Sequence, residues 1–599
     1  MHVIATAGHV DHGKSTLVKA LTGREPDRLP AERARGLSIE LGYVWTTLPS
    51  IGDLAFVDVP GHERFVPTML AGVGPVPAVL LVVAADDPWM PQAAEHLAAL
   101  DAWGVRHAVV AVTRSDLADP APMEARTRQE VERTSLAGAP VVAVSARTGA
   151  GLDELRACLT EMVGSLPVPD PDADVRLWVD RCFTVRGAGT VVTGTLPAGT
   201  VRVGDALSSG TATLRVRGIQ SLGLPVDQAS GVARVALNVA GADRAELDRH
   251  SVLVAPGAWR FAGAIDVRLR STTGRHDQAP ARRLVLHVGA VSVPVYLRPL
   301  GDDLARLTLD RPLPLRVGDS ALLRDPGSRR IWGVTVLDPA PPPLGRRGAA
   351  RERATVLAAA GRPADLSSEV ARRGIVHVDL LRQIGVPVGP SERASATSDG
   401  WLVADREVQR LRPLLEDLVR RHEADEPLEP GLPVATVAER LQLPSTELVG
   451  LLVDPPLRVA HGRVTATVAG PPVERLAPAV DAAVTAVETE LAAAPFVAPT
   501  ADRLRELRLD PRATALAVRA GRLLHLGDGI VLRTGSDDLA VRLLRDLAQP
   551  FTTSEARIRL GTSRRVVLPL LQLLDRQGRT RRLADDRRSV VSVERRSRA

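Results

Sequence analysis

Short apolar segments alternate with amphipathic stretches through the first part of the chain. The apolar segments have the length of buried strands, and they cover residues 3–7, 54–59, 79–84, 108–113 and 141–145. Strands that alternate with helices predict a parallel sheet covered by helices on both faces. We therefore expect an α/β domain over residues 1–170.

After about residue 170 the pattern changes to short alternating strands separated by Gly and Asp turns. No long helical period interrupts them, which predicts two β-barrels, over residues 171–257 and 258–338. Prolines then cluster at residues 339–343. A proline-rich segment of this kind is typical of a stiff linker, which we place at residues 339–348.

Beyond the linker the pattern is helical and repeats. Residues 441–448, 507–514 and 558–565 align position for position, each with a helix before it and an apolar helix and a hairpin after it. Helix, turn, helix and hairpin is the order of a winged helix. We expect four such domains, over residues 349–405, 406–469, 470–535 and 536–599. The predicted fold is thus multidomain, with an α/β domain, two β-barrels and an α+β array of winged helices.

Charge is concentrated at the C-terminus. The 599 residues carry a net charge of +6, yet residues 551–599 hold 13 arginines and five acidic residues, a net charge of +8. A basic terminus on a nearly neutral body indicates a phosphate-rich partner, and a solubilising arginine surface is the alternative.

Composition and hydropathy exclude several classes of protein. No apolar run approaches the ~18 residues that span a bilayer, and the chain begins in a strand with no signal peptide. Two cysteines, Cys158 and Cys182, fit a reducing compartment. We therefore expect a cytoplasmic protein with no membrane partner.

A phosphate-binding loop follows the first predicted strand. Its glycines let backbone N–H groups wrap phosphates, and the helix after it adds positive potential. Lys14 would reach the β- and γ-phosphates, and the Ser15 hydroxyl would bind Mg²⁺. The loop consists of Gly8, His9, Val10, Asp11, His12, Gly13, Lys14, Ser15 and Thr16.

Further residues at strand ends complete a site for Mg²⁺ and the γ-phosphate. Asp58 ends a strand, where its carboxylate can hold the metal through water, and the Gly61 N–H can sense the γ-phosphate. Ser38 offers a second hydroxyl to Mg²⁺. His62 is the candidate catalytic residue, since it can position the attacking water.

The base is predicted to be guanine. Asp116 follows Thr113 and Arg114 at the end of another strand, and its carboxylate can accept hydrogen bonds from guanine N1 and N2. Adenine offers no such pair of donors. Ser145 and Ala146 fit a backbone contact to guanine O6. We therefore expect the α/β domain to be a P-loop GTPase that uses GTP and Mg²⁺.

At this point a resemblance to a known family is plain. Residues 8–16, 35–42, 58–69 and 90–96 resemble the GTP-binding domain of translational elongation factors that deliver aminoacyl-tRNA. Residues 27–36 resemble the short first switch of the selenocysteine-specific elongation factors, and the four winged helices resemble the appendage of the bacterial members. The resemblance covers essentially the whole chain.

The resemblance implies a monomeric, ribosome-stimulated GTPase. It would bring selenocysteinyl-tRNA to the ribosome at a recoded UGA while its tail holds a hairpin (SECIS) in the same mRNA. Another tRNA-delivery or sulfate-activation GTPase of the superfamily is the alternative. A DNA-binding regulator with a vestigial nucleotide domain is a third possibility, disfavoured because every phosphate- and metal-binding position is filled.

Two positions depart from the family pattern. Thr113 and Arg114 stand where Asn and Lys are usual, and Ser38 stands where Thr is usual. The whole chain has one asparagine and two lysines, so both departures look like compositional drift. Thr113 lacks the amide that tethers guanine N7 and the phosphate loop, which predicts a weaker hold on the nucleotide.

The resemblance also implies an aminoacyl pocket in the first barrel. Its matching residues are Asp180, Arg181 and Arg234, with the arginines facing selenium. A thiol titrates near ~8.5 and selenols are more acidic, so this cargo is anionic at neutral pH and fixed positive charge would favour it over serine. A structural ion pair between barrel strands is the alternative interpretation.

The last winged helix holds the candidate RNA contacts. Thr562 or Ser563 is predicted to cap a helix whose apolar positions recur at i, i+3, i+4 and i+7, which puts Arg564 and Arg565 on an exposed first turn. Basic residues there oppose the helix dipole, which makes sense if a phosphate docks. The predicted RNA-binding set, which includes the following hairpin, is Arg559, Ser563, Arg564, Arg565, Arg579, Arg581, Arg582 and Arg587.

Overall fold

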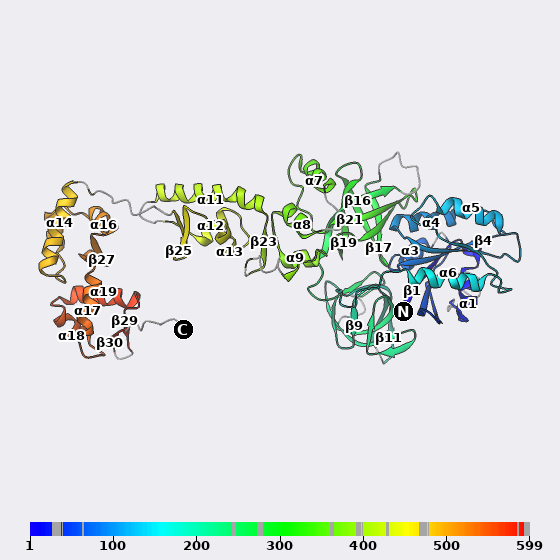
Figure 1. The fold of residues 1–599 in the computed structure, drawn as a ribbon, viewed down its shortest axis with the longest axis horizontal. Coiled ribbons are helices and arrows are strands. Elements are labelled where there is room, and N and C mark those ends of the chain that lie inside the picture. The colour runs from blue at the N-terminus through cyan, green and yellow to red at the C-terminus, as the bar shows by residue number, and fades with distance from the viewer. Residues whose placement is uncertain are drawn as a thin grey trace. The chain divides into compact units, whose positions relative to one another are not determined.

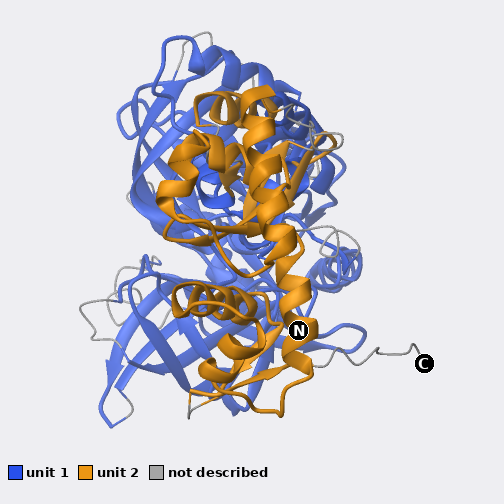
Figure 2. Cartoon of the chain, turned by 90° about the vertical axis from the view of Figure 1, so that its left-hand side faces the viewer, with its two compact units in different colours: residues 1–415, 434–452 blue, residues 416–433, 453–599 orange. Residues whose placement is uncertain are grey.

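The computed structural model of the chain describes most of its residues. These are residues 1–26, 38, 40–62, 65–187, 189–241, 247–271, 280–359, 365–390, 397, 399–426, 431–466, 476, 478–583 and 586–591. Contacts divide the chain into two compact units, residues 1–415 with 434–452 and residues 416–433 with 453–599 (Figure 2). Within the described residues, no helix combines the length and the apolar character that crossing a membrane requires.

A six-stranded sheet forms the N-terminal domain (Figure 1). Its strands, in spatial order, are β2 (Gly42–Leu48), β3 (Gly52–Asp58), β1 (His2–Ala7), β4 (Ala78–Ala84), β5 (His107–Thr113) and β6 (Val141–Ala143). The last five are parallel, as predicted. A sixth strand, β2, was not among the predicted ones, and it pairs antiparallel with β3 at the edge of the sheet. Only three residues separate these two strands, and a connection so short permits antiparallel pairing alone.

Helices cover both faces of this sheet. Alternate residues of β1 point to opposite sides, so Val3 and Ala5 pack in one apolar core while Ile4 packs in the other. The first face carries α3 (Val66–Val73), α4 (Pro91–Trp103) and α5 (Ala121–Val131), and the second carries α1 (Lys14–Thr22) and α6 (Leu152–Gly164). The short turn η1 (Val10–His12) precedes α1. This is the predicted doubly covered α/β domain.

The first β-barrel closes through six strands, because β10 pairs with both β11 and β15. The ring runs β7 (Arg176–Val185), β8 (Gly189–Leu196), β14 (Ala233–Ala240), β11 (Thr213–Ser221), β10 (Ala206–Ser208) and β15 (Val252–Val254). Smaller strands β9 (Thr200–Arg202), β12 (Leu224–Val226) and β13 (Gln228–Ser230) lie beside it. The pairing of β7 with β8 shifts between Val179 and Arg181, which places Asp180 in a β-bulge.

The second barrel is closed and packs on its neighbours. Its strands are β16 (Phe261–Ser271), β19 (Leu304–Pro314), β18 (Val291–Pro299), β17 (Arg283–Val288), β20 (Ser320–Arg324) and β21 (Ile331–Asp338). Trp178 of the first barrel packs against Gly289, where a Cβ atom would lie 2.3 Å from the indole. Leu322 and Ile331 join the core of the N-terminal domain. The three domains are therefore packed as one body.

A buried ion cluster anchors the helical region of unit 1 to the second barrel. Arg353 lies on α7 (Ala349–Ala358) and donates to the Asp266 and Asp338 carboxylates, which are fully buried. Arginines of α8 (Leu366–Arg373) also donate to Asp338. The remaining elements of unit 1 are β22 (Ile375–His377), α9 (Val378–Gln383), β23 (Trp401–Val403), α12 (Val434–Arg440) and α13 (Glu447–Leu452).

Unit 2 repeats the predicted order of helix, helix and hairpin. One round is α14 (Pro478–Ala493), α15 (Ala501–Glu506), α16 (Pro511–Arg519), β27 (Leu523–Gly527) and β28 (Ile530–Arg533); the next is α17 (Ser536–Arg545), α18 (Thr553–Arg559), α19 (Arg564–Arg576), β29 (Thr580–Arg582) and β30 (Arg588–Val590). Helix α11 (Asp405–Asp425) spans the division between the units, and β24 (Leu432–Pro433), β25 (Leu457–Ala460) and β26 (Arg463–Ala466) form a small sheet. The last two rounds share one apolar core.

Candidate functional site

The phosphate loop has the geometry that its sequence predicts. It runs from the end of β1 through η1 into α1, so its backbone N–H groups and the helix N-terminus surround one point. Lys14 is 4% exposed, and its ammonium donates to the carbonyl oxygens of Gly8 (3.1 Å) and His9 (2.7 Å). At Gly8 a Cβ atom would lie 2.0 Å from the Val82 carbonyl oxygen, so this position requires glycine.

Oxygen atoms from three segments gather beside Lys14. The Ser15 hydroxyl donates to the Asp58 carboxylate at 2.6 Å and lies 3.1 Å from the Ser38 hydroxyl. Thr6 donates to the other Asp58 oxygen at 2.7 Å, which holds the carboxylate in position. Hard oxygen ligands are those that Mg²⁺ prefers, so Ser15, Ser38 and Asp58 fit the predicted metal. The first-switch segment, residues 27–36, lies outside the described residues.

Three histidines near the loop are neutral at physiological pH. Burial lowers the pKa of His12 to about 4 and that of His96 to about 3, and it also lowers the pKa of His9. The Gly8 N–H donates to His96 Nδ1 at 2.9 Å, which fixes the start of the loop against α4. His12 faces the Val82 carbonyl oxygen at 3.4 Å. These rings support the loop and leave the positive charge near the phosphates to Lys14.

Gly61 lies directly against the phosphate loop. A Cβ atom there would lie 2.4 Å from Lys14 Nζ and 2.6 Å from Val10 N, so only glycine fits. The next residue is His62, whose ring centroid lies 6.0 Å from that of Phe65. The predicted catalytic histidine therefore stands one residue from a contact with the loop.

The predicted guanine reader is oriented by two neighbours. The Ser145 hydroxyl donates to Asp116 Oδ1 at 2.7 Å, and Arg147 lies 3.1 Å from Oδ2. The hydrogen bond from Ser145, assisted by Arg147, lowers the pKa of Asp116, so its carboxylate stays ionised. Ala146 follows Ser145 directly after the sheet. Sequence and structure thus agree on which residues meet at this end of the site.

The expectation that Thr113 loses its tether to the phosphate loop is wrong. Its hydroxyl donates to the His12 carbonyl oxygen at 2.7 Å, and it lies 3.1 Å from the Val83 carbonyl oxygen. Arg114 also donates to the Asp11 carbonyl oxygen, while the Asp86 carboxylate holds it at 3.1 Å. The Thr113 hydroxyl and the Arg114 guanidinium therefore tie this strand to the loop, in place of the amide that is usual in the family.

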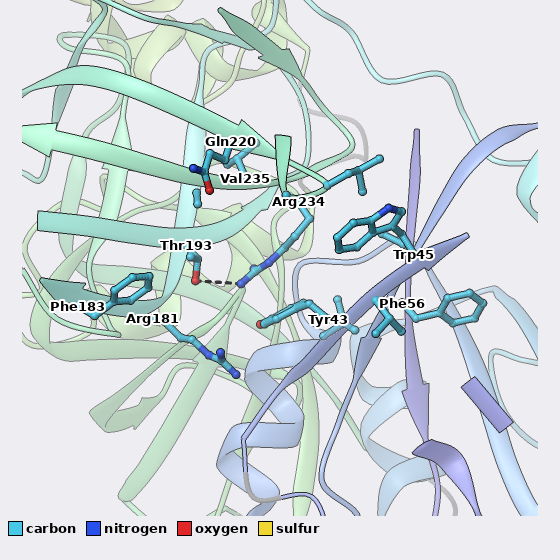
Figure 3. Close-up of a pocket in the computed structure, with 15 residues that line it drawn as sticks. Tyr43, Trp45, Phe56, Arg181, Phe183, Thr193, Gln220, Arg234 and Val235 are labelled. Carbon is cyan, nitrogen blue, oxygen red and sulfur yellow. Dashed lines mark hydrogen bonds between the residues drawn. The ribbon is translucent and has the colours of Figure 1, made fainter. Parts of the chain in front are cut away.

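In the first barrel, Asp180 and Arg234 form a buried pair. Arg234 donates to Asp180 through both terminal nitrogens, one at 2.7 Å, and to the Thr193 hydroxyl at 3.0 Å (Figure 3). Burial works against the guanidinium charge, but the Asp180 carboxylate outweighs it and raises the pKa of Arg234. The structural ion pair that was the alternative interpretation is therefore present, and Arg234 also lines a pocket.

The N-terminal domain contributes one wall of that pocket. The Tyr43 ring of β2 lies 3.7 Å from the guanidinium carbon of Arg234 and 5.3 Å from that of Arg181. Burial raises the pKa of Tyr43, so its hydroxyl stays neutral. Arg181 donates to the Leu41 carbonyl oxygen and lies 3.3 Å from Glu40. Figure 3 shows both arginines reaching toward Tyr43.

Two cavities are lined by residues of this group. One of about 260 Å³ is lined by Tyr43, Trp45, Arg181 and Arg234 (Figure 3). The other, of about 630 Å³, has walls from all three packed domains, and both Asp180 and Arg181 line it. Neighbours on a regular strand point to opposite faces, and the β-bulge at Asp180 accounts for both reaching one cavity.

Sequence reasoning missed three supporting residues. Thr6 was the one polar side chain inside an otherwise apolar strand, which was a usable signal for its bond to Asp58. His96 stood in the motif at residues 90–96 without a role. Tyr43 is one of two tyrosines in the chain, but nothing in the sequence linked it to the first barrel.

The last winged helix divides the predicted RNA contacts into two groups. Ser563 is the N-cap of α19 but makes no side-chain capping bond, and the Thr562 hydroxyl instead donates to the Phe496 carbonyl oxygen. Ser563, one of the two predicted capping residues, is therefore the N-cap by backbone position, although its side chain makes no capping bond. Arg564 and Arg565 are exposed and have no partner among the described residues. The predicted buried face is confirmed by Val567, Leu570, Leu571 and Leu574, all fully buried.

Three of the other five arginines in the predicted RNA-binding set are paired with carboxylates. Arg559 lies 2.7 Å from Asp546, and Arg582 donates to Asp586 at 2.8 Å. Arg579 bridges Asp537 and Asp538, which ties the hairpin to α17. Arg581 is exposed without a partner in the described part of the chain, and Arg587 is exposed. The hairpin tip, residues 584–585, lies outside the described residues.

Fold and site together define a translational GTPase. Residues 1–165 match the family model of the elongation factor Tu GTP binding domain, and residues 542–589 match that of the elongation factor SelB winged helix. The chain is 33% identical to the selenocysteine-specific elongation factor of Escherichia coli (strain K12), over 98% of each chain. It therefore belongs to the family of selenocysteine-specific elongation factors.

One further relative agrees with this assignment, and one solved structure shares the fold. The selenocysteine-specific elongation factor of Desulfomicrobium baculatum is 38% identical over 58% of this chain and 56% of that protein. The crystal structure of a bacterial selenocysteine-specific elongation factor EF-Sec shares the fold, with a TM-score of 0.75 at 23% identity, over 99% of this chain and 100% of that chain. The predicted fold class, GTP use and GTPase activity are thereby confirmed.

Proposed function

We propose that the GTP-bound protein carries selenocysteinyl-tRNA to the ribosomal A site at recoded UGA codons in the cytoplasm. A hairpin of the same mRNA would be held by the last winged helix, with one protein monomer bridging the two RNAs. The observation that carries the proposal is that Asp180 and Arg181 both line the cavity walled by three domains, while Arg234 is hydrogen-bonded to Asp180. The cavity volume of about 630 Å³ falls in the range of small-molecule sites, which suits the aminoacyl end of a tRNA.

Charge explains the selectivity that this pocket would have. A selenolate is anionic where a serine hydroxyl is neutral, so a guanidinium favours the first by a charge-assisted hydrogen bond. Asp180 would keep Arg234 in place by its two hydrogen bonds rather than touch the cargo itself. Tyr43 would cover the guanidinium plane and exclude water, which strengthens the contact.

The nucleotide site would act as a switch for this cargo. Lys14 would hold the β- and γ-phosphates, and Asp116 would read the guanine base. Ser15, Ser38 and Asp58 would hold Mg²⁺, which when bound neutralises negative charge on the phosphates. His62 would orient the water that attacks the γ-phosphate once the ribosome has positioned it.

Protection of the aminoacyl bond tests the proposed cargo. The GTP-bound protein should slow deacylation of selenocysteinyl-tRNA and leave seryl-tRNA unprotected at the same concentration. Equal protection of both forms, or of neither, would reject selenocysteinyl-tRNA as the specific cargo.

Hydrolysis has its own test. His62→Ala should leave GTP and tRNA affinity unchanged while ribosome-stimulated turnover falls on the order of 100-fold, the lower end of what a positioned proton-transfer group contributes. Single-turnover hydrolysis with programmed ribosomes measures this. Unchanged turnover would remove His62 from the mechanism.

A further inference from the structure

One short segment touches both the predicted metal site and the predicted aminoacyl pocket. At its start the Ser38 hydroxyl lies 3.1 Å from that of Ser15. Five residues later the Tyr43 ring lies 3.7 Å from the guanidinium of Arg234. The chain from Ser38 to Tyr43, of which residue 39 lies outside the described residues, therefore joins the two predicted sites.

Glu40 lies between these two ends and faces Arg181. Its carboxylate is 3.3 Å from the Arg181 guanidinium, which also donates to the Leu41 carbonyl oxygen. Arg181 and Arg249 line the cavity outside the buried pair of Asp180 and Arg234. Of these two cations, Arg181 is the one that this segment contacts. In this conformation that cation already faces a carboxylate.

The charges of this cluster balance without a cargo. Arg181 and Arg234 supply two positive charges, and Asp180 and Glu40 supply two negative ones. Arg249 also lines the cavity, but an anionic cargo that binds Arg181 itself meets the carboxylate already facing it. The Asp180 side chain is 3% exposed and held by two partners, whereas the Glu40 side chain is 54% exposed. Moving Glu40 into water costs little, because exposed ion pairs are weak.

We propose that Glu40 is a specificity-determining residue that competes with the anionic side chain of the cargo for Arg181. Binding of the nucleotide at Ser38, two residues earlier, sets how strongly Glu40 competes. The inference rests on the proposed function. It makes Glu40 the link through which GTP raises affinity for selenocysteinyl-tRNA, and linkage requires that the cargo raise affinity for GTP over GDP by the same factor.

Glu40→Gln removes the charge and keeps the shape. The GDP-bound variant should bind selenocysteinyl-tRNA about two- to fivefold tighter than the GDP-bound wild type, the range expected for an exposed ion pair. Affinity of the GTP-bound variant should change less than about twofold, so the ratio between the two nucleotide states shrinks. Seryl-tRNA, with no anionic side chain, should gain nothing.

Two other variants serve as controls. Glu25→Gln removes a carboxylate of the same domain that pairs with Lys19 at 2.9 Å. Among the described residues it has no ion pair with either barrel, so the ratio should stay as in the wild type. Glu40→Asp keeps the charge one methylene further back and should fall between the wild type and Glu40→Gln. Thermal unfolding of all three should match the wild type, since both carboxylates are exposed.

The outcomes separate the inference from the function on which it rests. If the wild type prefers selenocysteinyl- over seryl-tRNA and Glu40→Gln leaves the ratio of GTP to GDP affinities unchanged, the role of Glu40 is overturned and the proposed cargo stands. A gain for both aminoacyl forms overturns the competition as well. If the wild type shows no preference, the proposed cargo fails and this inference fails with it.

Discussion

The nucleotide site and the last winged helix both present side chains suited to phosphate, and they do so in opposite ways. In the N-terminal domain Lys14, Asp58, Thr113 and Ser145 are at most 4% exposed, and each is hydrogen-bonded to another segment of the domain. In the winged helix Arg564 and Arg565 stand in solvent without a partner among the described residues.

This difference in burial determines how each site selects its ligand. A buried, hydrogen-bonded site is organised before the ligand arrives, so it recognises one molecule in one position. Exposed arginines follow a phosphate backbone by charge, and their binding weakens as salt rises. Substitutions at the first site should therefore change which ligand binds, and those at the second should change how salt affects binding.

Asp116→Asn gives the largest effect expected on the side of the nucleotide site. The amide replaces a double acceptor with one acceptor and one donor, so GTP affinity should fall roughly 100-fold while xanthosine triphosphate gains. Competition binding with both nucleotides measures the shift. Asp119→Asn, which changes a nearby carboxylate bonded to the Ala121 N–H, should leave GTP preference intact. A variant that still prefers GTP by the wild-type margin would show that Asp116 does not read guanine.

Arg181→Ala sharpens the comparison within the proposed pocket. Loss of one charge-assisted contact should weaken binding of selenocysteinyl-tRNA about tenfold or more, and GTP binding should not change. Arg217→Ala, an exposed arginine of β11, is the matched control. Equal losses for the selenocysteinyl and seryl forms would mean that Arg181 only links the domains. Arg234→Ala is less informative, since it strands the buried Asp180 carboxylate and destabilises the barrel by about 3–5 kcal/mol.

The sequence predicted the nucleotide site well because its parts follow strands. Each of Asp58, Thr113 and Ser145 comes at or just after the end of a buried strand, and parallel strands bring these ends to one edge. The motif residues therefore met as expected. The error at Thr113 came from reasoning by residue type, because a shorter side chain on the same backbone still reaches the His12 carbonyl oxygen.

Contacts between domains were beyond such reasoning. Asp180, Arg181 and Arg234 were correctly expected to lie together, but Tyr43 and Glu40 reach them from another domain over more than 130 residues of sequence. The winged helix shows the same limit. Apolar spacing predicted the buried face of α19. Counting arginines, however, did not separate Arg579, held by two carboxylates, from Arg564, which pairs with no carboxylate of the described residues.

Replacing both Arg564 and Arg565 with alanine tests the last winged helix, where binding is expected to depend on salt. If both contact hairpin phosphates, the slope of log affinity against log salt should fall by roughly 1.4–1.8, from about 0.7–0.9 per contact. Arg542→Ala with Arg545→Ala removes the same charge from exposed positions of α17 and should lower the slope less. Intrinsic GTP hydrolysis and the melting temperature should stay as in the wild type. Hairpin affinity equal to the wild type at every salt concentration would leave these arginines as a solubilising surface.

Thr113→Val gives the smallest effect and tests the corrected role of this residue. Valine keeps the shape and removes the hydroxyl, so the buried His12 carbonyl oxygen loses its donor and the phosphate loop loses one of its ties. A hydrogen bond of this kind is worth about 0.5–1.5 kcal/mol, which corresponds to roughly two- to tenfold faster release of GDP and GTP.

Thr127→Val is a stringent control, since the Thr127 hydroxyl is buried on α5 with no partner among the described residues and its loss should change nothing. Thr113→Asn introduces the amide that is usual in the family and should hold the nucleotide at least as well as the wild type. Fluorescent-nucleotide release compares the four proteins directly. Equal release from Thr113→Val and the wild type would mean that Arg114 alone fastens the loop to this strand.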